Sequence, residues 1–257
     1  MIALCDCITD DRKREVKEHG SFAFPVACYS NDRHTIPVPW HWHDELEMII
    51  IEKGSALVRF SSEKYEVTEG NGCFINAGVL HAVEKTSDAF LQERCLVFHP
   101  RLIGGSIDSV FWQKYVLPVI SDRSLPGVFL DKAISWQQKM IGHIRTAWEV
   151  CADEKEAYEM TARNELSLCI GILKQQQSVR EKVLPEKILR QNERMKMMLK
   201  FIQQHFDETI AIRQIAASAS VSESECMRCF RQTIGIAPIA YLKNYRLQCA
   251  AELLKNT

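Results

Sequence analysis

The first hundred residues alternate short hydrophobic runs with small or polar residues. Gly54 and the stretches 61–62, 70–72 and 76–78 interrupt these runs. This spacing is typical of an antiparallel barrel or sandwich, in which strands are short and turns are frequent. We predict strands within residues 48–51, 56–60, 65–67, 73–75 and 96–98.

Beyond residue 105 the hydrophobic positions take on a helical period, which places apolar side chains on one face of a helix. Two such series are Trp136, Met140, Ile144 and Trp148, then Leu166, Ile170 and Leu173. The stretch 157–177 lacks proline and ends in a run of glutamines. We expect an amphipathic helix that pairs with its copy in a homodimer; the alternative is a helix that packs on its own barrel.

A third pattern occupies residues 209–254 and predicts two short helices around a tight turn, then a longer helix. Ile212, Ile215 and Ala216 fall on one apolar stripe of the first helix. Ser222 and Glu225 fit a capping box at the start of the second helix. This is the arrangement of a helix-turn-helix DNA reader followed by a linker helix.

The second of these helices has an apolar side and a polar side. Cys226, Cys229 and Phe230 form the apolar side, Gly235 suits the left-handed position after its end, and Pro238 suits the first turn of the next helix. Cys226 and Cys229 spell C-x-x-C, a zinc or redox pattern elsewhere. Since both face inward, we interpret them as core residues. The next helix is expected to bury Tyr241, Leu242, Tyr245, Leu247, Ala250, Ala251, Leu253 and Leu254.

Charge adds modest support. The chain carries 32 Lys and Arg against 33 Asp and Glu, a net charge of −1. Residues 194–257 carry +4 and residues 1–193 carry −5. A basic tail on an acidic body fits a partner with phosphates, whereas the alternative is a helical domain with solvated charges.

These residues together resemble the first helix-turn-helix of the AraC/XylS family of bacterial transcription regulators. The matching residues are Ile215-Ala216, Val221-Ser222, Phe230-Arg231, Gly235, Pro238, Tyr241, Leu242, Tyr245-Arg246-Leu247, Ala250 and Leu253-Leu254. One departure is Ser220, where the family often has glycine in a left-handed turn, at a cost of roughly 1 kcal/mol.

The resemblance implies where DNA is contacted. It assigns Ser224, Met227 and Arg228 to base contacts and Arg231 or Gln232 to phosphates. A guanidinium at Arg228 binds guanine O6 and N7 as a fork. The family has a second such motif, which is expected after residue 257 and is not in this sequence. Specific DNA binding by this chain alone is therefore expected to be weak.

The strand-rich region also contains a motif that resembles both cupin signatures. His41, His43 and Glu47 fit H-x-H-x3-E, and His81 closes the second signature. In metal-binding cupins the residues at these positions hold a transition metal, and histidines at i and i+2 of a strand point to one face. AraC-type sensor domains often retain this cupin motif but bind a small organic effector instead of a metal. Here the effector would bind in a polar pocket lined by these four residues and Trp42.

Both alternatives remain open at this point: no cofactor is required, and a divalent transition metal in the barrel is the competing interpretation. The corresponding alternative function is a metal-dependent cupin enzyme, a dioxygenase or isomerase. A dimerisation or interaction module is a third. The effector could be a sugar, an acid or an aromatic compound. Gly-rich phosphate loops and the G-x-S-x-G and H-E-x-x-H motifs do not occur in the sequence.

The sequence thus predicts an α+β protein in four parts. These are a cupin-like effector-sensing barrel (1–105), a helical dimerisation region (106–182), a linker (183–193) and a partial AraC-type DNA-binding domain (194–257). No signal peptide and no apolar run of ~18 residues is evident, so we expect a cytoplasmic location with reduced thiols. The expected partners are promoter DNA, a small effector, a second copy of the chain and, for an activator, RNA polymerase; no membrane is expected.

Overall fold

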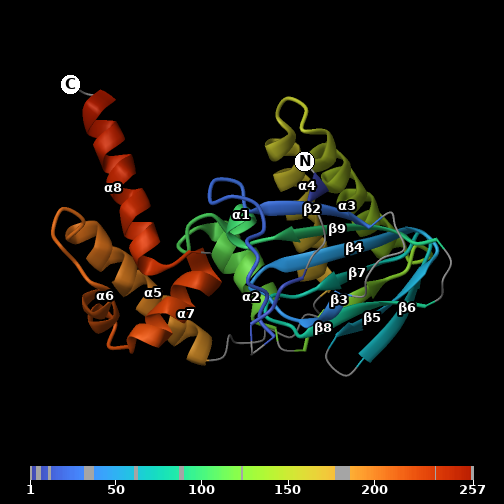
Figure 1. The fold of residues 1–257 in the computed structure, drawn as a ribbon, viewed down its shortest axis with the longest axis horizontal. Helices are drawn as coiled ribbons and strands as arrows, with labels where there is room; N and C mark the ends of the chain where they lie inside the picture. The colour runs from blue at the N-terminus through green and yellow to red at the C-terminus, as the bar shows by residue number, and fades with distance from the viewer. Residues whose placement is uncertain are drawn as a thin grey trace. The chain divides into compact units, whose positions relative to one another are not determined.

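The chain forms two compact units, residues 1–180 and 181–257 (Figure 1). The computed structural model describes residues 2–3, 7–10, 13–31, 38–60, 63–86, 90–122, 124–176, 186–234 and 236–255. The first unit combines two β-sheets with helices, and the second is helical. The predicted α+β class, with strands in the N-terminal unit and helices in the C-terminal unit, is confirmed.

Two sheets build the first unit. The larger has the strand order β1-β2-β9-β4-β7-β10 and the smaller the order β3-β8-β5-β6. Their bounds are β1 Ile2–Ala3, β2 Val26–Asn31, β3 Val38–His41, β4 Leu46–Lys53, β5 Ser55–Phe60, β6 Glu63–Thr68, β7 Gly72–Ile75, β8 His81–Lys85, β9 Gln92–Phe98 and β10 Gly127–Leu130. The β1–β2 pairing is parallel, and the other described pairings are antiparallel.

The five strands predicted from hydrophobic runs are confirmed as β4, β5, β6, β7 and β9. The prediction missed β1, β2, β3, β8 and β10. No hydrogen-bonded strand pair joins the two sheets within the described residues, so the expected barrel is an open one of two facing sheets.

Strand β4 shows how the sequence places a polar group inside this barrel. Alternate residues of a strand face opposite sides of its sheet. Ile49 and Ile51 belong to the core between the sheets. Met48 and Ile50 are buried on the other face, where helix α3 (Ser135–Asp153) packs. Glu47 has the parity of Ile49, and it is buried at 6% exposure. Its carboxylate therefore lies between the sheets.

Helices cover the outer face of the larger sheet (Figure 1). They are α1 Arg101–Gly104, a π-helix Trp112–Val116, α2 Leu117–Ile120, α3 Ser135–Asp153 and α4 Tyr158–Gln176. Helix α3 packs on β2, β4, β9 and β10, and α4 packs on α3.

The apolar stripe of α4, the helix that we expected to pair with its copy, packs within the chain. Leu166, Ile170 and Leu173 are at most 2% exposed, because α4 packs on α3 and also contacts α1, α2 and the π-helix. The side of α4 left open carries Met160 and Leu168, which are 61% and 50% exposed. The apolar stripe is therefore occupied within the chain, and dimerisation through this helix, which would use its open side, stays a prediction.

The second unit consists of α5 Glu186–Gln204, α6 Ile212–Ser218, α7 Glu223–Ile234 and α8 Pro238–Lys255. Helix α5 begins inside the stretch expected to be a linker, so residues 186–193 are helical. Further along α5, Met195, Met198 and Ile202 form a buried stripe at helical spacing. Residues 177–185 of the linker region lie outside the described residues, as does Gly235.

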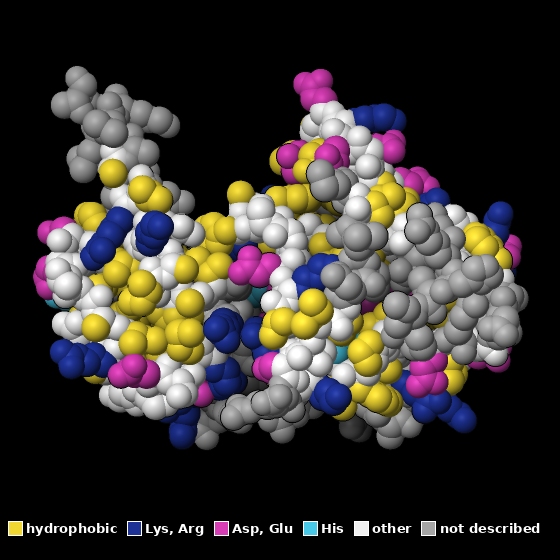
Figure 2. All heavy atoms as spheres, viewed as in Figure 1, with side chains coloured by type: hydrophobic (Ala, Val, Ile, Leu, Met, Phe, Trp, Pro, Cys, Tyr) yellow, Lys and Arg dark blue, Asp and Glu magenta, His cyan; other side chains and the backbone are white. Residues whose placement is uncertain are grey.

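Helix α8 begins at Pro238, as predicted. It buries Leu242 to 3% exposure, but Leu247 is 60% exposed, which corrects the expectation that Leu247 is part of the core. In the view of Figure 2, hydrophobic side chains of this unit gather centrally, with Lys and Arg side chains at their margins. Within the described residues, a helix long and apolar enough to cross a membrane is not found.

Candidate functional site

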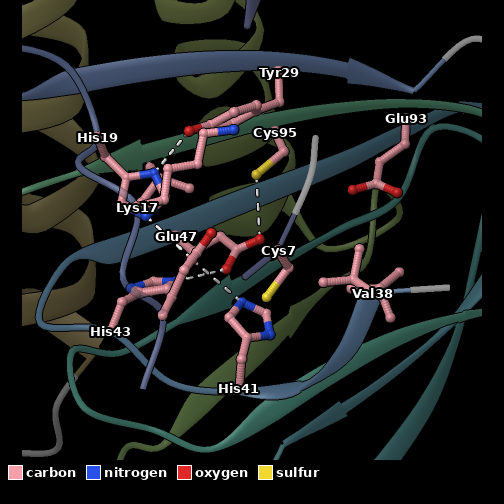
Figure 3. Close-up of a pocket in the computed structure, with 13 residues that line it drawn as sticks. Cys7, Lys17, His19, Tyr29, Val38, His41, His43, Glu47, Glu93 and Cys95 are labelled. Atoms are coloured by element: carbon pink, nitrogen blue, oxygen red, sulfur yellow. Dashed lines mark hydrogen bonds and ion pairs between the residues drawn. The ribbon is translucent and has the colours of Figure 1, made fainter. Parts of the chain in front are cut away.

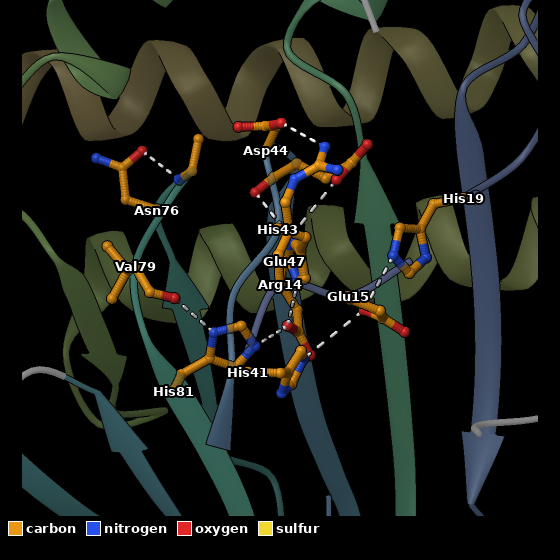
Figure 4. A network of polar contacts seen from close by, with 12 residues as sticks. Arg14, Glu15, His19, His41, His43, Asp44, Glu47, Asn76, Val79 and His81 are labelled. Atoms are coloured by element: carbon orange, nitrogen blue, oxygen red, sulfur yellow. Dashed lines mark hydrogen bonds and ion pairs between the residues drawn. The ribbon is translucent and has the colours of Figure 1, made fainter. Parts of the chain in front are cut away.

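The structure brings His41, His43, Glu47 and His81 together in the barrel, with one potential ligand atom of each within 4.8 Å of the others (Figure 4). All four are buried. Strands β3 and β8 pair His41 with His81 in register, and the two rings lie 4.1 Å apart. We expected His43 to lie on the same strand as His41. This was wrong, because β3 ends at His41 and His43 follows it.

Each histidine ring is oriented by a backbone carbonyl two residues away. Nδ1 lies 2.9 Å from the Pro39 carbonyl oxygen in His41, 3.2 Å from that of Glu45 in His43 and 2.8 Å from that of Val79 in His81. A carbonyl only accepts hydrogen bonds, so Nδ1 of each ring carries a hydrogen. The Nε2 atom of each ring is therefore the one directed to the shared site.

The carboxylate of Glu47 occupies the centre of this cluster. Its Oε2 lies 2.7 Å from Nε2 of His81 and 3.2 Å from Nε2 of His43. The contact with His81 is short, yet its angles are not those of a hydrogen bond. Cys95 donates its thiol hydrogen to Oε1 at 3.2 Å. Because Nδ1 already carries a hydrogen, such close approaches to a carboxylate require a second proton on the ring or a cation between the groups.

Electrostatics divide the roles of these groups. Burial raises the pKa of Glu47, but the charge of His81 and the hydrogen bond from His43 outweigh it and hold the pKa well below its usual value. Burial lowers the pKa of His81, and Glu47 reverses this, so that the pKa is raised. Burial, followed by the charge of His81, lowers the pKa of His41 to about 4. The charges of Glu47 and His81 thus stabilise each other, beside a His41 that is neutral at neutral pH.

The space in front of this cluster is a pocket of about 390 Å³, including its open mouth (Figure 3). Its lining residues are Cys7, Glu15, Lys17, His19, Tyr29, Val38, His41, His43, Glu47, Val83, Glu93, Cys95 and Val97. Two residues expected at the pocket are not in this lining. His81 lies fully buried behind His41, and the half-buried Trp42 has the Arg14 guanidinium over its ring at 5.7 Å.

Sequence reasoning missed the N-terminal contribution to the pocket. His19 contacts the Tyr29 hydroxyl through Nδ1 at 2.8 Å and the Glu15 carboxylate through Nε2 at 3.2 Å. Oε2 of Glu15 also lies 3.8 Å from Nε2 of His41. The only signal for these residues was chemical type, because the segment shows no strand or helix period that predicts its position.

The four-residue cluster fits a transition metal. Three imidazole nitrogens and a carboxylate are ligands that suit such ions. The bonds from Nδ1 to backbone carbonyls are the outer contacts that orient metal-binding histidines and fix their tautomer. Glu47 supplies the negative charge that a divalent cation needs in a buried site.

In the second unit, α6 and α7 form the predicted helix-turn-helix. Ile215 and Ala216 of α6 are buried, as is Phe230 of α7. Ser220 in the turn has a φ of 53°, the left-handed conformation that the resemblance implied. Ser222 accepts a hydrogen bond from the backbone N–H of Glu225 at 3.2 Å, which confirms this half of the predicted capping box.

The candidate DNA-contacting residues lie on the open side of α7. Ser224, Arg228 and Arg231 are exposed and Met227 is half-buried, whereas the side chain of Gln232 lies outside the described residues. The Glu225 carboxylate holds Arg228 through Nε at 2.9 Å and Nη2 at 2.6 Å. The capping-box glutamate is therefore bound to the guanidinium that was expected to contact guanine.

The two cysteines of the C-x-x-C sequence lie on the opposite, buried side of α7. Burial raises the pKa of each thiol, Cys226 and Cys229, to about 11. Inward-facing protonated thiols behave as small core residues. The interpretation of this pair as core is in agreement with the structure.

Comparison with known proteins places these two units in a class. The family model described as the AraC-like ligand binding domain matches residues 23–131. The uncharacterized HTH-type transcriptional regulator YdeC of Bacillus subtilis (strain 168) is 31% identical over 252 residues, which cover 97% of this chain and 85% of YdeC. The HTH-type transcriptional activator RhaS of Klebsiella pneumoniae (strain 342) is 26% identical over 222 residues, covering 85% and 74%.

Among solved structures, the AraC-like transcriptional activator CuxR is similar with a TM-score of 0.41 and 11% identity, over 88% of this chain and 73% of CuxR. The sequence relatives are what establish the family. The chain belongs to the AraC family of helix-turn-helix transcription regulators, with an AraC-like ligand-binding domain before its DNA reader. It is a DNA-binding regulator, and the alternative of a metal-dependent enzyme is not supported by its relatives.

Proposed function

We propose that this chain is an effector-responsive regulator in which a small molecule bound in the barrel pocket changes how the reader binds promoter DNA. The observation that carries this proposal is a pocket lined by several titratable side chains in one unit of a chain whose other unit presents Arg228 and Arg231 on the exposed side of a helix. The effector must bind two arrangements of the chain with different affinity, since only differential binding shifts an equilibrium.

The pocket chemistry favours a polar effector. Its lining combines imidazoles, carboxylates, a lysine and a tyrosine hydroxyl, which can donate to and accept from a sugar or an acid. We propose that the chain acts as a homodimer through the open side of α4, in the cytoplasm where promoter DNA is found, and with RNA polymerase as a partner if it activates.

The test is DNA binding by the full chain. Sequences selected from a random DNA pool are measured by gel shift at several salt concentrations, and affinity is expected to fall as salt rises. Arg228→Ala should weaken binding of the selected sequence by about 1–3 kcal/mol and relax the preference for one base. Lys155→Ala removes the same charge from the exposed surface of the other unit and should change little. Salt-independent binding that Arg228→Ala leaves intact would contradict the proposal.

We also propose that His41, His43, Glu47 and His81 hold a divalent transition metal. The carbonyl-fixed Nδ1 atoms and the three converging Nε2 atoms support this. When bound, the ion would supply a positive charge and a Lewis-acid contact for an anionic or hydroxyl-bearing effector. Metal analysis of the purified protein is expected to find a stoichiometric ion that is lost on His43→Ala. Purification of wild type without metal, and failure to load it, would contradict this assignment.

A further inference from the structure

The N-terminal segment adds a second donor set at the mouth of the pocket. We propose that Cys7, Glu15 and His41 bind a thiophilic divalent ion such as Zn²⁺, and that this ion fastens the N-terminal hairpin, residues 7–19, to the barrel. The site deepens the proposed sensing function by naming a metal ion as a pocket ligand. It differs from the four-residue cluster because two of its three donors come from the hairpin.

The geometry of the three donors is the first support. One ligand atom from each of Cys7, Glu15 and His41 lies within 4.8 Å of the other two, close enough to share one ion after small side-chain movements. Glu15 and His41 are buried, and Cys7 is half-buried. Thiolate, imidazole and carboxylate are the three side-chain types that bind zinc, and a site with three protein ligands keeps a position open for water or an effector.

The hairpin is held in place by contacts that do not involve these donors. Val16 N–H donates to the Ile8 carbonyl at 2.9 Å, which pairs the two arms of the hairpin. The N–H groups of Glu15 and Trp42 donate to the carbonyls of Trp42 and Lys13, each at 2.9 Å, and Arg14 pairs with Asp44 at 2.8 Å. The backbone thus presents Glu15 to His41 before any ion binds.

The charges around the site are balanced for a cation. Glu15 faces His19 and His41, and hydrogen bonding and charge from these rings overcome burial and lower its pKa. The nearby cation Lys17 lies over the Tyr29 ring at 5.0 Å. Cys7 must lose its thiol proton to solvent on binding, so affinity is expected to rise with pH.

His41 links this site to the four-residue cluster. Its Nδ1 is bonded to the Pro39 carbonyl, so only Nε2 is left to bind an ion. An ion that uses the hairpin set therefore withdraws His41 from the other set. Which set is used in solution can be measured, because only the hairpin set contains a thiolate.

The experiment is a Co²⁺ titration of the metal-free full chain, followed by displacement with Zn²⁺. We expect a thiolate-to-cobalt charge-transfer absorption that is lost in Cys7→Ser, with affinity reduced roughly 10-fold or more. Cys5→Ser is the matched control, since Cys5 is a neighbouring cysteine of the same segment, and it should keep the absorption. In parallel, Zn²⁺ is expected to slow trypsin cleavage at Lys13, Arg14 and Lys17 in wild type and in Cys5→Ser but not in Cys7→Ser.

Three outcomes would overturn the proposal. They are cobalt bound without a thiolate absorption, an absorption that survives Cys7→Ser, and cleavage that Zn²⁺ does not slow. The first would leave the four-residue metal site standing, because it has no sulfur ligand. None of them concerns DNA, so the gel-shift test of the regulator succeeds or fails independently.

Discussion

At the scale of single residues, the buried polar groups of the barrel are the informative ones. Glu47 sits at 6% exposure among imidazoles, and its charge is compensated mainly by His81. A buried ion pair is weak support for stability in itself, but removal of one partner leaves an uncompensated buried charge. We therefore interpret the cluster as a binding site more than as a contribution to stability. A bound ligand or ion can supply the positive charge that compensates Glu47.

We expect His81→Ala to destabilise the chelator-treated protein by about 3–5 kcal/mol, because Glu47 loses its main counter-charge. Urea unfolding followed by fluorescence measures this. The control is His143→Ala, which removes a histidine paired with Glu165 at 2.6 Å on half-exposed surface and should cost less than about 1 kcal/mol. Equal losses in both variants would show that Glu47 is not compensated by His81.

A second expectation concerns pH and His41. Its pKa is lowered from 6.5 to about 4 in the folded chain, so the unfolded chain binds more protons between these values. This contribution to stability is present above pH 6.5 and is lost as the pH falls toward 4. Between pH 7 and pH 5, chelator-treated wild type should lose about 2 kcal/mol more than His41→Gln in urea unfolding. The same pH dependence in both proteins would show that burial does not keep His41 neutral.

At the scale of elements, periodicity predicted the existence of helices and strands but not their partners. The series Leu166, Ile170 and Leu173 correctly marked a helix. Its burial against α3 rather than a second chain depends on where α3 lies, which the period of one segment does not contain. The start of helix α5 was not predicted. Its first turns are rich in charged residues, so we expected a linker there instead of a helix.

The open side of α4 leads to a prediction about assembly. Leu168 is 50% exposed, and a charge in the middle of an apolar dimer contact is costly. Leu168→Glu is therefore expected to shift sedimentation from dimer to monomer while helix content stays the same. Lys139→Glu, at an exposed position of neighbouring α3, is the control and should remain dimeric. A monomeric wild type, or a dimer insensitive to Leu168→Glu, would count against the α4 interface.

At the scale of the whole molecule, each unit has a buried core of its own. Ile49 and Val97 belong to the core of the first, and Met198 and Phe230 are buried in the second. Separate cores allow separate unfolding, in which a substitution affects the stability of its own unit alone. Such independence suits a regulator whose sensing and reading units respond to different ligands.

Calorimetry of the full chain is therefore expected to show two transitions. Ser220→Gly should raise the free energy of unfolding of the second unit by up to about 1 kcal/mol, and with it the temperature of that unit's transition. The reason is that glycine adopts the left-handed turn at φ 53° without steric cost. Arg213→Gly, at an exposed position within helix α6, should lower the free energy of unfolding of the same unit by roughly 0.5–1 kcal/mol. A single transition that both substitutions shift together with the barrel would mean that the units unfold as one.

The sequence by itself determined the parts of this protein that depend on near neighbours. The sequence alone predicts several such features. They are the helical and strand periods, the cap at Ser222, the turn at Ser220 and the spacing of His41, His43 and Glu47. These features are local, because hydrogen bonds and side-chain directions within one element repeat over a few residues.

Only the tertiary structure decided which distant groups meet. It brought Glu15 and Cys7 to His41, placed His81 behind them, and buried the α4 stripe within the chain. The physical reason is that burial and charge pairing depend on the path of the whole chain, so residues far apart in sequence acquire their chemistry from each other.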